Sequence, residues 1–145
     1  MENIRQLSIN DVLKIISETN NKEIEKGKKG IGFWLFEKDI EKYPNIFTNN
    51  SPLKMNYFGL YDDDNLQCIA LSAISFDCPF TYNEYPCIIR IESTKNGAGI
   101  RMLNWLFYFL QKENYKGVTI NIYNEDYAEK YKKMGFERYS DNPLY

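Results

Sequence analysis

The stretch from Cys87 to Leu110 constrains the fold more than any other part of the chain. It begins with a β-branched run at residues 88–91 and continues into a turn at residues 94–99 that contains two glycines. From residue 100 onward the pattern is helical, because polar residues recur at three- and four-residue spacing and form one narrow stripe. The stripe consists of Arg101, Asn104, Tyr108, Gln111 and Lys112. We therefore expect a strand, a glycine turn and a largely buried helix in succession.

This order of elements is typical of an anion-binding site. The first amides of a helix have no intrahelical partner, and the helix dipole is positive at that end. Gly97 and Gly99 permit positive φ and would let a diphosphate approach the backbone, while Lys95 adds a positive charge nearby. A glycine pair before a helix is more often an ordinary turn without a ligand, so this stretch alone leaves both interpretations open.

The remaining segments predict an α/β fold with a mixed sheet, in the order β-α-α-β-β-β-α-β-α-β. Strands are predicted at residues 4–7, 56–61, 66–76, 88–92, 118–122 and 136–139. One helix begins after Ser8, which with Asp11 forms a capping pattern, and ends near Asn20 or Asn21. Further helices are predicted over 33–43, from 100 to 112, and from Asn124 as N-cap to a C-terminal Gly135.

Length and charge restrict the class of protein. A chain of 145 residues with 43 % hydrophobic content is expected to form one soluble domain over 1–145. The formal net charge of -2 and a pI of about 5.3 argue against a general attraction to nucleic acid. No apolar run approaches the ~18 residues of a membrane span, and the first residues lack a signal-peptide core. We expect a cytoplasmic protein that does not bind membranes.

The sequence contains no histidine, which excludes Ser-His-Asp and Cys-His nucleophiles and the common zinc sites. Its three cysteines, Cys68, Cys78 and Cys87, lack CxxC spacing and are interpreted as reduced core residues. The acidic run 62–64 lacks the glycine and glutamate of an EF-hand loop, so we interpret it as a hairpin turn. We expect no metal site.

Two motifs point to a family. Thr94-Lys95-Asn96-Gly97-Ala98-Gly99 is similar to a Gln/Arg-x-x-Gly-x-Gly/Ala loop, with Thr94 at the position where Gln or Arg is usual. Downstream, an Asn, a Tyr seven residues later and a Gly-Phe pair match Asn124, Tyr131, Gly135 and Phe136. In this order, separated by a strand, the motifs resemble those of the GNAT superfamily of acyl-CoA-dependent N-acyltransferases. The resemblance covers about residues 56–139.

The resemblance implies a mostly antiparallel central sheet with helices on both faces, and direct transfer of an acetyl group from acetyl-CoA to an amine. The CoA pyrophosphate would be held by the backbone amides of Lys95, Asn96, Gly97, Ala98, Gly99 and Ile100. The edge of the strand from Ile89 to Glu92, which includes Ile91, would pair with the pantetheine arm. Asn124 would lie near the pantetheine.

Two residues are candidates for acid-base catalysis. By the resemblance, Tyr131 would be the general acid for the departing thiolate. If the family motif is set aside, packing on one side of the last helix explains this tyrosine. Glu92, at the end of the strand predicted at residues 88–92, is the candidate base, because an amine of pKa about 10.4 must lose a proton near pH 7. The alternative for Glu92 is an ion pair with Arg90 on the same strand face.

The leading hypothesis is an acetyl-CoA-dependent N-acetyltransferase that uses acetyl-CoA as cosubstrate. The alternative is a catalytically inactive GNAT-like domain that binds acyl-CoA or a protein partner, which the substitution at Thr94 leaves open. A nucleotide-binding module built on Gly27–Gly32 fits less well, because no Lys-Ser/Thr follows the loop. The amine acceptor, a small molecule or a protein, is not identified by the sequence, and the many aromatic residues are compatible with a homodimer.

Overall fold

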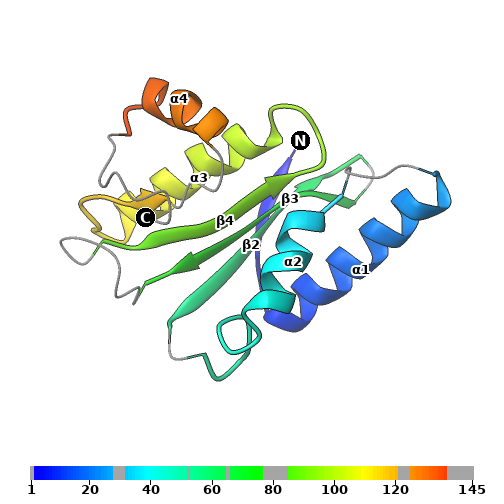
Figure 1. The fold of residues 1–145 in the computed structure, drawn as a ribbon. Coiled ribbons are helices and arrows are strands. Elements are labelled where there is room, and N and C mark those ends of the chain that lie inside the picture. Colours follow the sequence, from blue (N-terminus) through cyan, green and yellow to red (C-terminus); the bar gives the residue numbers. More distant parts are fainter. Residues whose placement is uncertain are drawn as a thin grey trace.

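The structure is a computed structural model that describes residues 2–27, 32–51, 53–64, 66–76, 85–120 and 125–136, the side chains of 125–128 excepted. Figure 1 shows its helices and strands. In chain order they are β1 (Asn3–Leu7), α1 (Ile9–Glu25), α2 (Trp34–Lys42), β2 (Met55–Asp62), β3 (Gln67–Ser75), β4 (Cys87–Ser93), α3 (Ala98–Lys112), β5 (Thr119–Ile120) and α4 (Glu125–Lys133). This order agrees with the predicted one up to α4, and the predicted last strand falls mostly outside the described residues.

The five strands form one sheet in which the spatial order is the same as the chain order, β1-β2-β3-β4-β5. Strands β1 to β4 pair in antiparallel fashion, and β5 pairs in parallel with β4. The predicted mixed, mostly antiparallel sheet is therefore confirmed. The acidic hairpin between β2 and β3 is confirmed as well, and the Asp64 amide donates to Asp62 Oδ1 at 3.2 Å within its turn.

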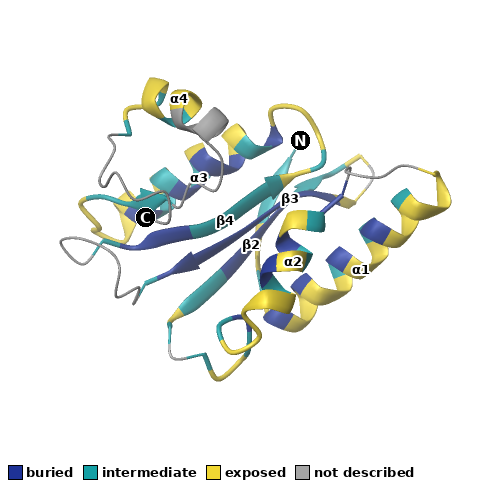
Figure 2. Ribbon diagram, viewed as in Figure 1, coloured by how far each residue is buried: buried dark blue, intermediate teal, exposed yellow. Residues whose placement is uncertain are grey.

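Helices cover both faces of the sheet, as predicted (Figure 1). The first cluster of buried residues lies between the sheet and the helices α1 and α2, and includes Val12, Phe33 and Phe36. A second cluster, on the opposite face, lies under α3 and includes Met102 and Leu106. Figure 2 shows the buried residues along the middle strands and on the helix sides that face the sheet. The polar stripe predicted for α3 is exposed, which confirms that interpretation.

Helix α1 begins as predicted but ends later. Ser8 Oγ accepts from the Asp11 amide and Asp11 Oδ2 accepts from the Ser8 amide, both at 3.1 Å, which forms a capping box. The predicted end near Asn20 is wrong, because α1 continues to Glu25. Asn20 is buried, and its Oδ1 accepts from the Phe33 amide at 2.7 Å. A tertiary contact thus uses the asparagine that otherwise favours a helix end.

A β-bulge in β4 decides which face its charged residues occupy. Ala73 of β3 pairs with Arg90, but the next residue of β3 pairs with Ile88. Ile89 is therefore an extra residue, and it packs against the first cluster, whereas Ile88 belongs to the second. Simple alternation would place Arg90 under α3 with Ile88. Because of the bulge, Arg90 and Glu92 lie on the face covered by α2 and both contact that helix. The two residues share a face, as the sequence predicts.

Two of the three cysteines lie in the core. Cys68 and Cys87 are buried free thiols, as predicted, and burial raises the pKa of Cys68 to about 12. Cys78 lies outside the described residues. In the described part of the chain, no helix combines the length and the apolar character needed to cross a bilayer.

Candidate functional site

The turn between β4 and α3 has the backbone geometry expected of a close approach to a ligand. Gly97 is the N-cap of α3 and adopts a left-handed conformation, with φ of 80°. A residue with a side chain would be strained there, by roughly 1–2 kcal/mol. Gly99, in contrast, lies within the first turn of α3 and is not among the glycines with positive φ. Of the two glycines that permit positive φ, Gly97 thus adopts it and Gly99 does not.

Backbone amides at the start of α3 remain available. The Ala98 amide donates to the Lys95 carbonyl at 3.1 Å, and the Arg101 amide donates to the Gly97 carbonyl at 3.2 Å. Between these two, the amides of Gly99 and Ile100 have no acceptor among the residues that the structure describes. No acidic residue lies in the first turn of α3. An anion would supply the missing acceptor at the positive end of the helix dipole.

Thr94 fixes the start of this turn. Its amide donates to the Ile69 carbonyl at 2.9 Å, and its hydroxyl donates to the same oxygen at 3.4 Å. Ile69 lies at the second bulge of the sheet, where β2 and β3 change register. Thr94, which departs from the family motif, therefore attaches the turn to β3.

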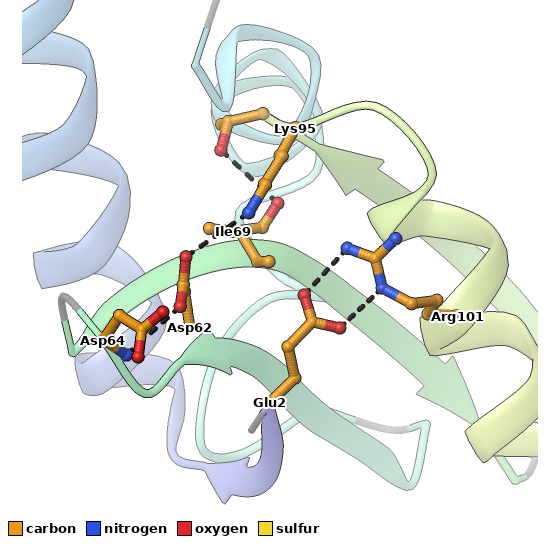
Figure 3. Close-up of polar contacts among 7 residues, drawn as sticks. Glu2, Asp62, Asp64, Ile69, Lys95 and Arg101 are labelled. Carbon is orange, nitrogen blue, oxygen red and sulfur yellow. Dashed lines mark hydrogen bonds and ion pairs between the residues drawn. The ribbon is translucent and has the colours of Figure 1, made fainter.

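Two cations, Lys95 in the turn and Arg101 in the first turns of α3, are each paired with a carboxylate from the β1–β2 part of the sheet (Figure 3). Lys95 Nζ lies 3.4 Å from Asp62 Oδ2. The Arg101 guanidinium donates to both carboxylate oxygens of Glu2, at 2.5 and 2.7 Å. The roles of Glu2, Asp62 and Arg101 were not predicted from the sequence. One signal was present at Arg101, because a cation near the start of a helix opposes the helix dipole.

Glu92 holds the amino end of α2. Its Oε1 accepts from the Phe36 amide at 2.9 Å, and its Oε2 accepts from the Leu35 amide at 3.3 Å. The N-cap residue of α2, Phe33, supplies no side-chain cap, so a residue from β4 performs that role. Burial raises the pKa of Glu92, and the two amides and Arg90 partly counteract the shift. A carboxylate whose pKa is raised is a stronger base than a solvent-exposed carboxylate. The carboxylate of Glu92 is also engaged in capping α2.

Arg90 forms a second connection between β4 and α2. Its Nε and Nη2 donate to the two carboxylate oxygens of Asp39 at 2.5 and 3.0 Å, in a bidentate pair. The two side chains are only 10 % and 11 % exposed. Asp39 of α2 is thus one partner of Arg90, and the charge of Arg90 also counteracts the raised pKa of Glu92. The ion pair between Arg90 and Glu92 that the sequence suggested stays a prediction.

Tyr131 takes part in the motif that ends α4. The Phe136 amide donates to the Tyr131 carbonyl at 3.1 Å and the Gly135 amide to the Lys132 carbonyl at 3.0 Å, with φ of 100° at Gly135. This is a Schellman motif, with the predicted glycine at C′. The rings of Tyr131 and Phe136 meet edge to face, their centroids 5.9 Å apart, on the second cluster. Packing therefore accounts for part of the role of Tyr131, and the acid role stays a prediction.

The candidate acid and base lie on different faces of the sheet. Tyr131 packs on the second cluster, under α3, whereas Glu92 reaches α2 on the other face. Between the faces runs the edge of β4, where the described pairing with β5 covers only Cys87 and Ile88. The predicted pantetheine strand, with Ile89 and Ile91, follows directly. Asn124 lies outside the described residues.

Comparisons by sequence give no match: no protein-family model matches this chain, and neither does any curated protein. Solved structures do match. A predicted acetyltransferase from Clostridium acetobutylicum, solved with acetyl-CoA, is 25 % identical, with a TM-score of 0.57 over 98 % of this chain and 93 % of that one.

Two other solved structures have the same fold and different named acceptors. Glucosamine-6-phosphate N-acetyltransferase from Arabidopsis thaliana is 16 % identical, with a TM-score of 0.53 over 97 % of this chain and 94 % of that one. A ribosomal-protein-alanine N-acetyltransferase from Brucella melitensis is 10 % identical, with a TM-score of 0.60 over 98 % of this chain and 96 % of that one. The similarity extends over nearly the whole of each chain, so it concerns the entire fold.

Proposed function

Because this chain has the fold of the GNAT superfamily, we propose that it is an N-acetyltransferase that moves an acetyl group from acetyl-CoA to an amine. One observation carries the proposal furthest: the start of α3 presents the amides of Gly99 and Ile100 behind a left-handed Gly97, with no described acceptor. The neighbour of 25 % identity, solved with acetyl-CoA, supports this choice of ligand.

In this proposal, the amides from Lys95 to Ile100 hold the pyrophosphate of CoA. The groups fit, because a diphosphate is a multiple acceptor and the turn offers donors at the positive end of a helix. The strand edge from Ile89 to Glu92 then pairs with the amides of the pantetheine arm, as an added strand would. By the resemblance to the family, Asn124 would lie near that arm.

The reaction is a direct transfer. The amine nitrogen attacks the thioester carbonyl carbon, the carbon–sulfur bond breaks, and CoA leaves as a thiolate. An amine of pKa about 10.4 is protonated at pH 7. Because the pKa exceeds the pH by about 3.4, removal of the proton costs roughly 4.6 kcal/mol. Glu92 accepts the amine proton, directly or through a water molecule, and its raised pKa suits that role.

Tyr131 donates its phenolic proton to the departing thiolate. A phenol of pKa about 10 is a weaker acid than a thiol of pKa about 8.5, so the transfer is uphill by roughly 2 kcal/mol. Lys132 and Lys133, both exposed beside it in α4, lower this barrier if their charges reach the developing phenolate.

The alternative function is binding of acyl-CoA without catalysis. Two observations favour it: Glu92 is engaged with the amides of α2, and the ring of Tyr131 packs on Phe136. Both catalytic candidates thus have structural contacts that would be retained in an inactive domain.

The test begins with calorimetric titration of the purified protein with acetyl-CoA, CoA and ATP. Micromolar binding of acetyl-CoA, with no binding of ATP, supports both CoA functions, and absence of acetyl-CoA binding rejects both. Turnover is then measured as free-thiol release with a panel of amines, which must include sugars and peptides, because the two neighbours named above differ in acceptor.

The variant Tyr131→Phe separates the two functions. An enzyme that uses the phenol loses turnover and still binds CoA. If turnover of the variant equals that of the wild type, Tyr131 has no acid role.

A further inference from the structure

We propose that Glu2 and Arg101 form an exchangeable ion pair beside the turn at residues 94–99. In the free protein the carboxylate of Glu2 binds the Arg101 guanidinium, and a phosphate group of acetyl-CoA displaces this carboxylate. The inference rests on the proposed function and adds to it an internal competitor of cofactor binding. It predicts that a carboxylate of the protein itself reduces the affinity for acetyl-CoA.

The position of Arg101 is the first argument. Its Nη1 lies 2.9 Å from the point that a Cβ on Gly97 would occupy, so the guanidinium lies against the turn. The amides of Gly99 and Ile100 belong to the same turn of helix. An anion that accepts from these amides is therefore next to the guanidinium, whose planar donors fit phosphate oxygens in pairs.

The helix dipole supplies the second argument. Arg101 is the fourth residue of α3, where the positive end of the dipole repels a cation, and no acidic residue of the first turn compensates. An anion from elsewhere has to balance this charge. In the free protein that anion is Glu2, which lies 99 residues away in the sequence.

The third argument is the arrangement of the four charges in Figure 3. In the register of β1 and β2, Asn3 pairs with Tyr61, which places Glu2 opposite Asp62 one residue further on. Two carboxylates in these positions repel each other, and they repel an incoming diphosphate as well. Each carboxylate contacts a cation at or beside the turn: Glu2 contacts Arg101, and Asp62 contacts Lys95.

The exposure of the pair makes exchange feasible. The side chain of Arg101 is 43 % exposed and that of Glu2 is 27 % exposed, and ion pairs in contact with water contribute little to stability. The Lys95–Asp62 contact is a single one at 3.4 Å, whereas the pair of Glu2 and Arg101 is bidentate. Glu2 is therefore the stronger competitor for the phosphate.

The experiment is a double-mutant cycle read by calorimetric titration with acetyl-CoA. Glu2→Gln removes the competing charge, and we expect the Kd to fall about three- to tenfold. Arg101→Gln removes the cation, and we expect the Kd to rise by a similar factor. In the Arg101→Gln background, Glu2→Gln should have a clearly smaller effect, because no guanidinium is left to release and only the repulsion between Glu2 and the diphosphate is removed.

Two control variants change the net charge equally without touching the turn. Glu41→Gln alters an exposed residue of α2 on the other face of the sheet, and Lys112→Gln alters the far end of α3. Neither should change the Kd by more than about twofold, since exposed charges beyond a Debye length of about 8 Å are largely screened at physiological salt.

The outcomes separate this inference from the proposed function. If acetyl-CoA binds but Glu2→Gln leaves the affinity unchanged, lowers it, or acts equally in the Arg101→Gln background, the exchange is refuted and the function stands. A second titration uses inorganic pyrophosphate, followed by the amide NMR signals of Gly99 and Ile100. Pyrophosphate binding that Glu2→Gln strengthens, without acetyl-CoA binding, supports the exchange and rejects the function. Absence of both binding events refutes both.

Discussion

Gly97 is the residue where a backbone requirement and the proposed cofactor contact coincide. We predict that Gly97→Ala lowers the free energy of unfolding by about 1–2 kcal/mol, because φ of 80° is unfavourable for a residue with a side chain. Its new Cβ would also lie 2.9 Å from Arg101 Nη1, a flexible group that can move. Urea denaturation followed by circular dichroism measures the change.

Gly99→Ala is the matched control, since it changes the same atoms two residues away. Its helical position should gain up to about 1 kcal/mol from the better helix propensity of alanine, and its Cβ would lie 3.4 Å from Ser93 Oγ. Its affinity for acetyl-CoA should nevertheless fall, because the methyl group keeps the diphosphate from the Gly99 amide. Equal stability losses in the two variants would contradict the assignment of strain to Gly97.

Glu92 should make stability depend on pH in an unusual direction. Burial raises its pKa above the unfolded value near 4.5, so its contribution to stability is greatest below that pH and is lost as pH rises through the folded pKa. We therefore predict that Glu92→Gln gains stability relative to wild type as pH increases from 4.5 upward. Urea unfolding of both proteins at several pH values measures the difference, with Glu41→Gln as the control. A difference that shrinks with rising pH would show that the amides of α2 dominate.

At the scale of elements, α2 is attached to β4 by the Arg90–Asp39 pair and by the contacts of Glu92. We predict that Asp39→Ala costs about 3–5 kcal/mol of unfolding free energy, because it leaves a largely buried guanidinium without this partner. The double variant Arg90→Met with Asp39→Leu should be more stable than Asp39→Ala alone, since no buried charge remains. Denaturation of the three proteins tests the order, and a double variant less stable than the single one would contradict it.

Local patterns predict these elements well where neighbours along the chain decide the structure. The capping box of Ser8 and Asp11 and the Schellman glycine at 135 both involve contacts within a few residues, and both are confirmed. The end of α1 was not predicted, because the side chain of Asn20 bonds to Phe33, across the connection between α1 and α2. The bulge at Ile89 was not predicted either, because it depends on the register between two strands.

At the scale of the whole molecule, the sequence was sufficient to predict the element order as far as α4, the mixed sheet and the coverage of both faces. It was not sufficient to predict which charges meet. Glu2 and Arg101 are 99 residues apart, and Asp39 and Arg90 are 51 apart, so no periodicity relates them. The candidate site was therefore predictable as a turn, from Gly97 and its neighbours, but not as a cluster of charges. The roles given to Asn124 and Tyr131 stay predictions.

A sheet whose strands stand in the order of the chain can be assembled while the chain is still being synthesised. Each of β2, β3 and β4 finds its partner strand already made when it emerges, so no earlier strand has to wait for a later one to be inserted beside it. Among the strands that the structure describes, β5 is the exception, because a parallel neighbour requires α3 to cross over first. Among the described strands, the seam between β4 and β5 should therefore close after the others during biosynthesis, beside the strand edge proposed for the pantetheine arm.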